Sequence, residues 1–225
     1  MVPPQSLEWA QLIYATQGSL AVECPIGKQL WYVPARRALW VPAGATCALR
    51  MRRAVRLRMI YLHEALMTKA QETHAINVSA LLHEAILEAV RRSVLSSVEP
   101  LSGLIKELLS ASPSVPLMLP MPQDPRALRV VRRLLRAPSK RETLPDLAHV
   151  SGASDRTLER LFTSETGMGF AAWRQRLRML EGMRLLMDGQ SVAAAADAVG
   201  YESVSAFVVA FKATVGETPG RWLRH

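Results

Sequence analysis

"LPDLAHVSGASDRTLERLFTSETG", residues 144–167, reads as two short helices joined by a tight turn. Gly152 is placed to end the first helix, Ser154 to cap the second, and Gly167 to end it. Residues 191–216, "SVAAAADAVGYESVSAFVVAFKATVG", repeat this layout. Each segment has the pattern of a helix–turn–helix motif, with a small residue where the helices cross, a short turn, and a second helix with one free face.

A single motif of this kind is a weak signal, because short helical hairpins are common in all-α domains. Here an arginine-rich helix, residues 170–189, joins the two motifs, which makes DNA binding a stronger interpretation. A further helix is expected to begin after Asp124, a good cap that is followed by proline. Residues 124–225 therefore predict an all-α domain with helix–turn–helix motifs at about 144–166 and 191–215.

The N-terminal part has a different pattern. Residues 1–66 contain short runs with strand-like alternation, cut by Gly and Pro, as in a small sandwich or barrel. Apolar residues at helical spacing in residues 76–110 predict two amphipathic helices that link the domains or form a dimer. Residues 112–125 hold five prolines and predict an extended linker. The sequence thus predicts an α+β multidomain fold, with linker and dimerisation helices in residues 67–123.

The composition is compatible with nucleic-acid binding. The net charge is +9, and most of the 28 Lys and Arg residues are arginines, whose planar fork suits phosphates and guanine edges. A GC-rich genome would give the same bias. Cys24 and Cys47 have neither metal-ligand spacing nor the pattern of a disulfide framework, so a reduced, cytoplasmic chain is expected. We find no membrane-spanning run and no export signal in the sequence.

The C-terminal half resembles the AraC/XylS family of bacterial transcription regulators. Two stretches, "LAHVSGASDRTLERLFTSETGMGFAAWRQRLRM" (147–179) and "AAAADAVGYESVSAFVVAFKATVGETPGRWLR" (193–224), match both motifs of that family. The resemblance implies a sequence-specific activator or repressor that sets two helix–turn–helix motifs in successive major-groove segments of double-stranded DNA. RNA polymerase is a further candidate partner. The most specific residues are Gly200, Tyr201, Ser203, Phe207, Phe211, Lys212, Gly216, Thr218 and Pro219.

The N-terminal half resembles, more loosely, the small cupin-type barrel of these regulators, which usually senses a small-molecule effector. The similar segments are residues 11–23 and 31–51. Metal-binding cupins use histidine ligands, but residues 5–7 are Gln-Ser-Leu, and Cys47 stands where many relatives have histidine. A lone thiol is not a metal site, so no metal and no cofactor are expected. The chain starts later than many relatives, so we expect a truncated barrel or a first strand upstream.

The first recognition helix is expected at residues 155–166. Its apolar face lies opposite Arg156, Arg160 and Thr163, with Thr157 and Glu159 beside them. Arginine can read guanine with two hydrogen bonds, and the resemblance places base contacts at Arg156, Glu159 and Arg160. Glu159 would accept a bond from cytosine N4 or orient a neighbouring arginine. The alternative for each arginine is a solvated surface charge.

The second recognition helix is expected to read less sequence. Val209 stands where relatives often have a long polar residue, and a small apolar group can meet a thymine methyl but cannot hydrogen-bond a base edge. The alternative is that this helix only packs within its domain and sits on the DNA backbone. Gly182 in the joining helix predicts close packing or a bend. The remaining candidate DNA contacts are Ser154, Arg174, Arg178, Ser203, Val204, Ser205, Lys212, Arg221 and Arg224.

Two other functions are weighed against this one. A metal-dependent cupin enzyme would need ligands that the strands lack, so we expect no catalysis. A protein-binding adaptor would use the small-residue face of residues 203–213 and would not bind DNA. The sequence therefore favours an effector-responsive, sequence-specific DNA-binding regulator that forms a homodimer in the cytoplasm, on the nucleoid.

Overall fold

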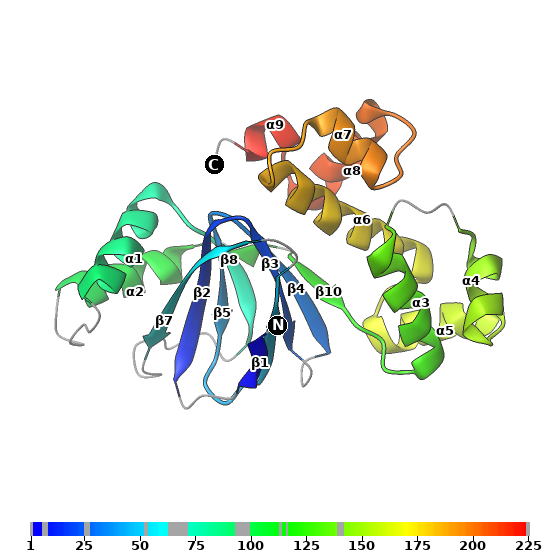
Figure 1. Ribbon diagram of the computed structural model, residues 1–225, viewed down its shortest axis with the longest axis horizontal. Coiled ribbons are helices and arrows are strands. Elements are labelled where there is room, and N and C mark those ends of the chain that lie inside the picture. The colour runs from blue at the N-terminus through cyan, green and yellow to red at the C-terminus, as the bar shows by residue number, and fades with distance from the viewer. Residues whose placement is uncertain are drawn as a thin grey trace. The chain divides into compact units, whose positions relative to one another are not determined.

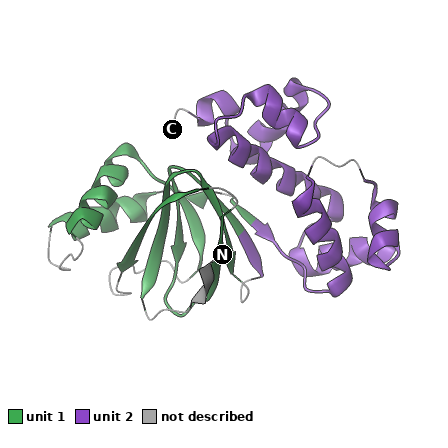
Figure 2. Cartoon of the chain, in the orientation of Figure 1, with its two compact units in different colours: residues 1–26, 31–118 green, residues 27–30, 119–225 purple. Residues whose placement is uncertain are grey.

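The computed structural model folds into two compact units, coloured separately in Figure 2. The first contains residues 1–26 and 31–118, and the second contains residues 27–30 and 119–225. The second unit thus includes a short segment from the N-terminal half of the chain. The residues that the structure describes are 2–5, 9–24, 28–51, 54–62, 72–92, 100–112, 114–115, 117–138 and 142–223.

The first unit is built on two five-stranded sheets, seen at the centre of Figure 1. One has the order β1-β6-β3-β4-β10, and the other has the order β7-β2-β5-β8-β9. The strand pairings of the described residues do not close these sheets into one barrel. The strands are β1 (Val2–Gln5), β2 (Ala10–Gln17), β3 (Ser19–Cys24), β4 (Gln29–Pro34), β5 (Arg37–Val41), β6 (Cys47–Arg50), β7 (Arg56–Leu62), β8 (His74–Asn77), β9 (Ser114–Val115) and β10 (Met118–Pro120).

Helices α1 (Ala80–Arg92) and α2 (Pro100–Ala111) pack on the second sheet. Strand alternation places Leu12, Tyr14 and Trp40 on the face that they cover, and all three are buried. The Tyr14 hydroxyl is hydrogen-bonded to His83 Nδ1 at 2.6 Å, and burial raises the pKa of Tyr14. The helical residues of this core are Leu82, Ala85, Ile86, Ala89, Ile105 and Leu109.

The sheets continue beyond the predicted division at residue 66, which lies outside the described residues. Strand β8 pairs with β5, and β9 pairs with β8. The proline-rich segment 112–125 is extended, as predicted, but it contributes β9 to one sheet and β10 to the other. These strands are two to four residues long, which is too short for a periodic pattern in the sequence.

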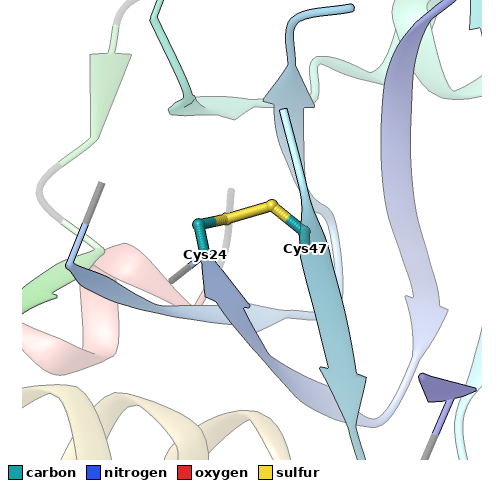
Figure 3. The surroundings of a disulfide bond; sticks show 2 residues. All are labelled: Cys24 and Cys47. Atoms are coloured by element: carbon teal, nitrogen blue, oxygen red, sulfur yellow. A yellow bond between two sulfur atoms is a disulfide. The ribbon is translucent and has the colours of Figure 1, made fainter. Parts of the chain in front are cut away.

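A disulfide joins Cys24 to Cys47, so the expectation of two unpaired cysteines was wrong. Figure 3 shows the two side chains meeting across neighbouring strands. Strands β3 and β6 are antiparallel with Glu23 opposite Ala48, and the next pair in this register is Cys24 opposite Cys47. The pairing follows from strand register, which the sequence spacing of 23 residues does not reveal.

The second unit is helical, as predicted for residues 124–225. Helix α4 ends at Gly152, with φ of 70°, and α5 ends at Gly167, with φ of 71°, so both glycines adopt the left-handed conformation that other residues resist. The helices are α3 (Pro125–Arg136), α4 (Leu144–Ser151), α5 (Asp155–Thr166), α6 (Phe170–Met187), α7 (Val192–Ala198), α8 (Val204–Val215) and α9 (Pro219–Trp222).

Helix α6 carries the core of the second unit. Near its start Trp173 is fully buried, its ring lies 5.2 Å from that of Phe162, and its indole N–H donates to the Pro120 carbonyl at 2.6 Å. Near its centre a Cβ on Gly182 would lie 2.9 Å from Cε2 of Phe207. This confirms the predicted close packing at Gly182, because a methyl group there would press on a buried ring.

Asp124 caps α3, and its carboxylate should make stability depend on pH. The Arg126 side chain and its backbone N–H both donate to this carboxylate and lower its pKa to about 2 from 3.8. A carboxylate whose pKa is lowered in the folded state stabilises the fold at pH values above its ordinary pKa. This contribution is lost as the pH falls through the folded-state pKa of about 2. We expect Asp124→Asn, which keeps an acceptor but does not titrate, to be less stable than the wild type at neutral pH, with a difference that shrinks as the pH falls toward 2. Urea unfolding at several pH values measures this difference, and a gap that stays constant with pH would contradict it.

Candidate nucleic-acid interface

The first motif consists of α4, its turn and α5. Thr143 caps α4 in a reciprocal capping box with Asp146, and Ser154 caps α5 by accepting from the Thr157 N–H at 3.2 Å. Leu158 and Phe162 are fully buried, and they fix which side of α5 faces the core. The start and rotation of the predicted recognition helix are therefore determined by caps and packing.

The opposite side of α5 is open to solvent. Arg156, Arg160 and Thr163 are exposed there, as the helical spacing predicts. Within the described residues, no hydrogen bond or ion pair engages the guanidinium of Arg156 or Arg160. Thr163 donates its hydroxyl to the Glu159 carbonyl at 2.9 Å. Two arginines thus project from a rigid helix with their donors available, which suits the recognition of guanine or phosphate.

Glu159 has a structural partner that the sequence did not indicate. Its carboxylate accepts from the Phe170 N–H at 3.3 Å and lies against Gly169, which caps α6 without a side chain of its own. In the free protein Glu159 therefore helps to start α6, and no described contact ties it to Arg156 or Arg160. It would have to leave this position to accept from a cytosine.

A second acid on α5, Glu165, was missed by the sequence reasoning. Its carboxylate accepts from the backbone N–H groups of Gln123 at 2.6 Å and Asp124 at 3.0 Å, just before α3. Glu159 and Glu165 thus satisfy free N–H groups at the starts of two other helices. The sequence showed only that these two glutamates lie on a helix between two others, which does not identify their partners.

The second motif consists of α7, its turn and α8. Ser191 and Ser203 cap the two helices, and Phe207 and Phe211 are fully buried. The side chain of Val209 is 70% exposed, the largest value among the exposed large apolar residues described, and Val204 is 42% exposed. Ser205 is also exposed. As predicted, the free face of α8 carries small or apolar side chains.

The basic residues around α8 and α9 are accessible. Lys212 and Arg221 are exposed, and Arg221 lies 3.7 Å from the carboxylate of Glu217 in a solvent-facing ion pair. Such a pair is weak and can be exchanged for a phosphate. The predicted contact Arg224 lies outside the described residues.

Arg174 and Arg178 of α6 are half-buried and bond to backbone carbonyls that follow α3 and precede α4. Arg174 donates to the Glu142 carbonyl, and Arg178 donates to the Pro138 carbonyl at 3.4 Å. Burial lowers the pKa of the Arg174 guanidinium, and the charge of Arg178 adds to this effect. Both arginines and Tyr201 line two hollows of about 430 and 440 Å³ beside the start of α8. Burial raises the pKa of Tyr201.

Other kinds of site are not indicated in the part of the chain that the structure describes. No three His, Cys, Asp or Glu side chains there are grouped to hold a metal ion. None of the helices described is long and apolar enough to cross a membrane. Residues 6 and 7, part of the segment compared with metal-binding cupins, lie outside the described residues.

Comparisons with known proteins agree with this geometry. A family model described as a helix-turn-helix domain matches residues 147–225. The chain is 31% identical over 217 residues to the HTH-type transcriptional regulator NimR of Escherichia coli, covering 95% of this chain and 79% of NimR. It is 35% identical over 103 residues to a putative AraC-like transcription regulator of Streptomyces lividans, covering 45% of this chain and 34% of that protein.

A solved transcriptional regulator from Chromobacterium violaceum, with an AraC-type DNA-binding domain, is also similar. It is 24% identical, with a TM-score of 0.42, and the match covers 43% of this chain and 88% of that one. The extent of the match to NimR, together with the two helix–turn–helix motifs, shows that the chain belongs to the AraC/XylS family of transcriptional regulators.

Proposed function

We propose that this regulator recognises its operator mainly through α5 and uses α8 mainly for positioning. The observation that carries the proposal is the pair Arg156 and Arg160, exposed on a helix whose other face is buried. Each can donate two hydrogen bonds to a guanine edge. The exposed face of α8 has Val209 at its centre, which can touch a thymine methyl but cannot donate or accept a hydrogen bond.

Phosphate contacts supply the remaining affinity in this proposal. The Ser154 hydroxyl lies at the N-terminus of α5, where free N–H groups favour an anion. Arg174 and Arg178 line the hollows beside α8, where a phosphate would lie near both positive charges. Each neutralised phosphate releases counterions, so operator binding should weaken steeply with salt. The other proposed contacts are Thr157, Thr163, Ser203, Val204, Ser205, Lys212 and Arg221.

The first unit is proposed to sense a small-molecule effector in a cupin-like fold. Two five-stranded sheets enclosing apolar residues support this assignment. Leu81 of α1 is 55% exposed and Val90 is 37% exposed, which supports dimerisation through these helices. The regulator would then act without catalysis, as a homodimer on DNA in the cytoplasm. RNA polymerase is the proposed partner in activation.

Binding sites selected from random DNA by the wild type, then tested with Arg160→Ala, show whether this arginine reads a base. We expect the variant to lose discrimination at one base pair by about 1–3 kcal/mol, because two hydrogen bonds to a base edge are removed. Arg132→Ala, which removes an exposed arginine of α3, is the matched control and should leave the preferred sequence unchanged. The proposal fails if Arg160→Ala binds the selected and the scrambled sequences with wild-type affinities.

A further inference from the structure

The cysteine pair of the first unit offers chemistry that operator recognition does not use. Cys24 and Cys47 are the two cysteines of the chain, so neither has another partner within it. Their Cα atoms are 4.4 Å apart, on strands that are held in register by their own pairing. Cys24 is 4% exposed and Cys47 is partly exposed. Cys47 is therefore the thiol that a dissolved oxidant would reach first.

The strands should stay paired when the bridge is open. The residues before Cys24 and after Cys47 remain paired in the β3–β6 ladder, and Arg50 forms an ion pair with Glu23 across it at 2.5 Å. Reduction would thus leave the thiols facing each other, ready to be oxidised again. Intracellular thiols are kept reduced, and disulfides found there are usually transient and redox-sensing.

The position of Cys24 connects this chemistry to the DNA-binding unit. Four residues after Cys24, Lys28 belongs to the second unit, and its carbonyl accepts from the Met121 N–H at 2.8 Å. The carbonyl of the preceding residue, Pro120, accepts from the indole of Trp173 in the core of that unit. The bond at the end of β3 therefore lies four residues along the chain from the acceptor of the Met121 N–H.

The geometry points to Cys24 and Cys47 as a reversible thiol–disulfide site that regulates DNA binding through Lys28 and Met121. A hydroperoxide is the oxidant. The Cys47 thiolate attacks its outer oxygen and releases an alcohol, or water from hydrogen peroxide, leaving a sulfenic acid. The Cys24 thiol then attacks that sulfur, and water leaves as the disulfide forms. A dithiol reductant returns two electrons and two protons and restores both thiols.

The first test follows the thiols and one amide in the full chain. Hydrogen peroxide should remove two hydrogens from the intact mass and protect both cysteines from alkylation. Hydrogen exchange at Met121 should then be slower than in the reduced chain, by about fivefold, because its acceptor is restrained. Gln123 and Asp124, which donate to Glu165 instead, are internal controls and should not change. Unchanged mass, or equal exchange at Met121 in both forms, overturns the inference.

The second test measures operator affinity and rests on the proposed function. We expect oxidised and reduced wild type to differ by about threefold or more in Kd, a modest allosteric effect. Cys24→Ser and Cys47→Ser should bind like the reduced wild type and ignore peroxide. A bridge that forms without changing Kd would contradict regulation. If neither the oxidised nor the reduced wild type binds operator, the proposed function fails, while the mass and exchange measurements still decide the chemistry of the thiols.

Discussion

Arg184→Ala should lower the free energy of unfolding by about 3–5 kcal/mol. Its guanidinium donates to both oxygens of Glu181, at 2.8 and 3.0 Å, and to Asp188 at 2.6 Å. The side chains of Glu181 and Asp188 are only 8% and 10% exposed. The variant would remove a cationic partner from both carboxylates, one in the last turns of α6 and one at its C-cap. Urea unfolding followed by far-UV circular dichroism, to which the helices contribute most, measures the loss.

A double variant separates the charge from the volume of the side chains. Glu181→Leu combined with Arg184→Met removes Arg184 and one of its two carboxylate partners, leaves Asp188, and keeps apolar contacts in place. Replacing a buried ion pair by apolar residues of similar size is often neutral, so we expect the double variant to be more stable than Arg184→Ala alone. Equal losses in the two proteins would mean that the uncompensated charge of Glu181 does not explain the effect.

Phe207→Ala should lower the free energy of unfolding by about 3–5 kcal/mol. Because the variant unfolds at a lower temperature, it should lose operator binding near that temperature. The ring is fully buried, 5.5 Å from that of Tyr201 and 5.7 Å from that of Phe211. Its removal leaves a cavity between α6 and α8, on the buried side of the second motif. Val209→Ala, on the exposed side of the same helix, should change stability by about 0.5 kcal/mol at most. Thermal and urea unfolding compare the two.

Gly182→Ala provides a double-mutant cycle for the same contact. In the wild type the added methyl group would meet the Phe207 ring at 2.9 Å, so overpacking should outweigh the gain in helix propensity of up to about 1 kcal/mol. In the Phe207→Ala background the space is open, and the same change should stabilise the protein. An effect of Gly182→Ala that is the same in both backgrounds would show that the two residues are not coupled.

Much of the second unit could be predicted from local signals. Ser154 and Ser203 begin recognition helices, and Gly167 and Gly216 end them, because caps act on the residues next to them. The exposure of Val209 followed from helical periodicity alone. The base contacts themselves stay predictions.

The features that escaped the sequence depend on distant segments. Glu159 and Glu165 bond to N–H groups 11 and 42 positions away, so their partners are set by how α5 packs. The Cys24–Cys47 bridge depends on the register of β3 and β6, which are separated in the sequence by two other strands. Cross-strand register is a property of the folded sheet, and one sequence offers no local signal for it.

The membership of residues 27–30 in the second unit matters for anyone who wants to exchange DNA-binding modules between regulators. A graft cut only at residue 119 would carry Met121 without Lys28, and so without the acceptor of its N–H. A chimera therefore needs two junctions in the recipient, one on each side of this short insert. The specificity module of this regulator is discontinuous in the gene, although it is compact in space.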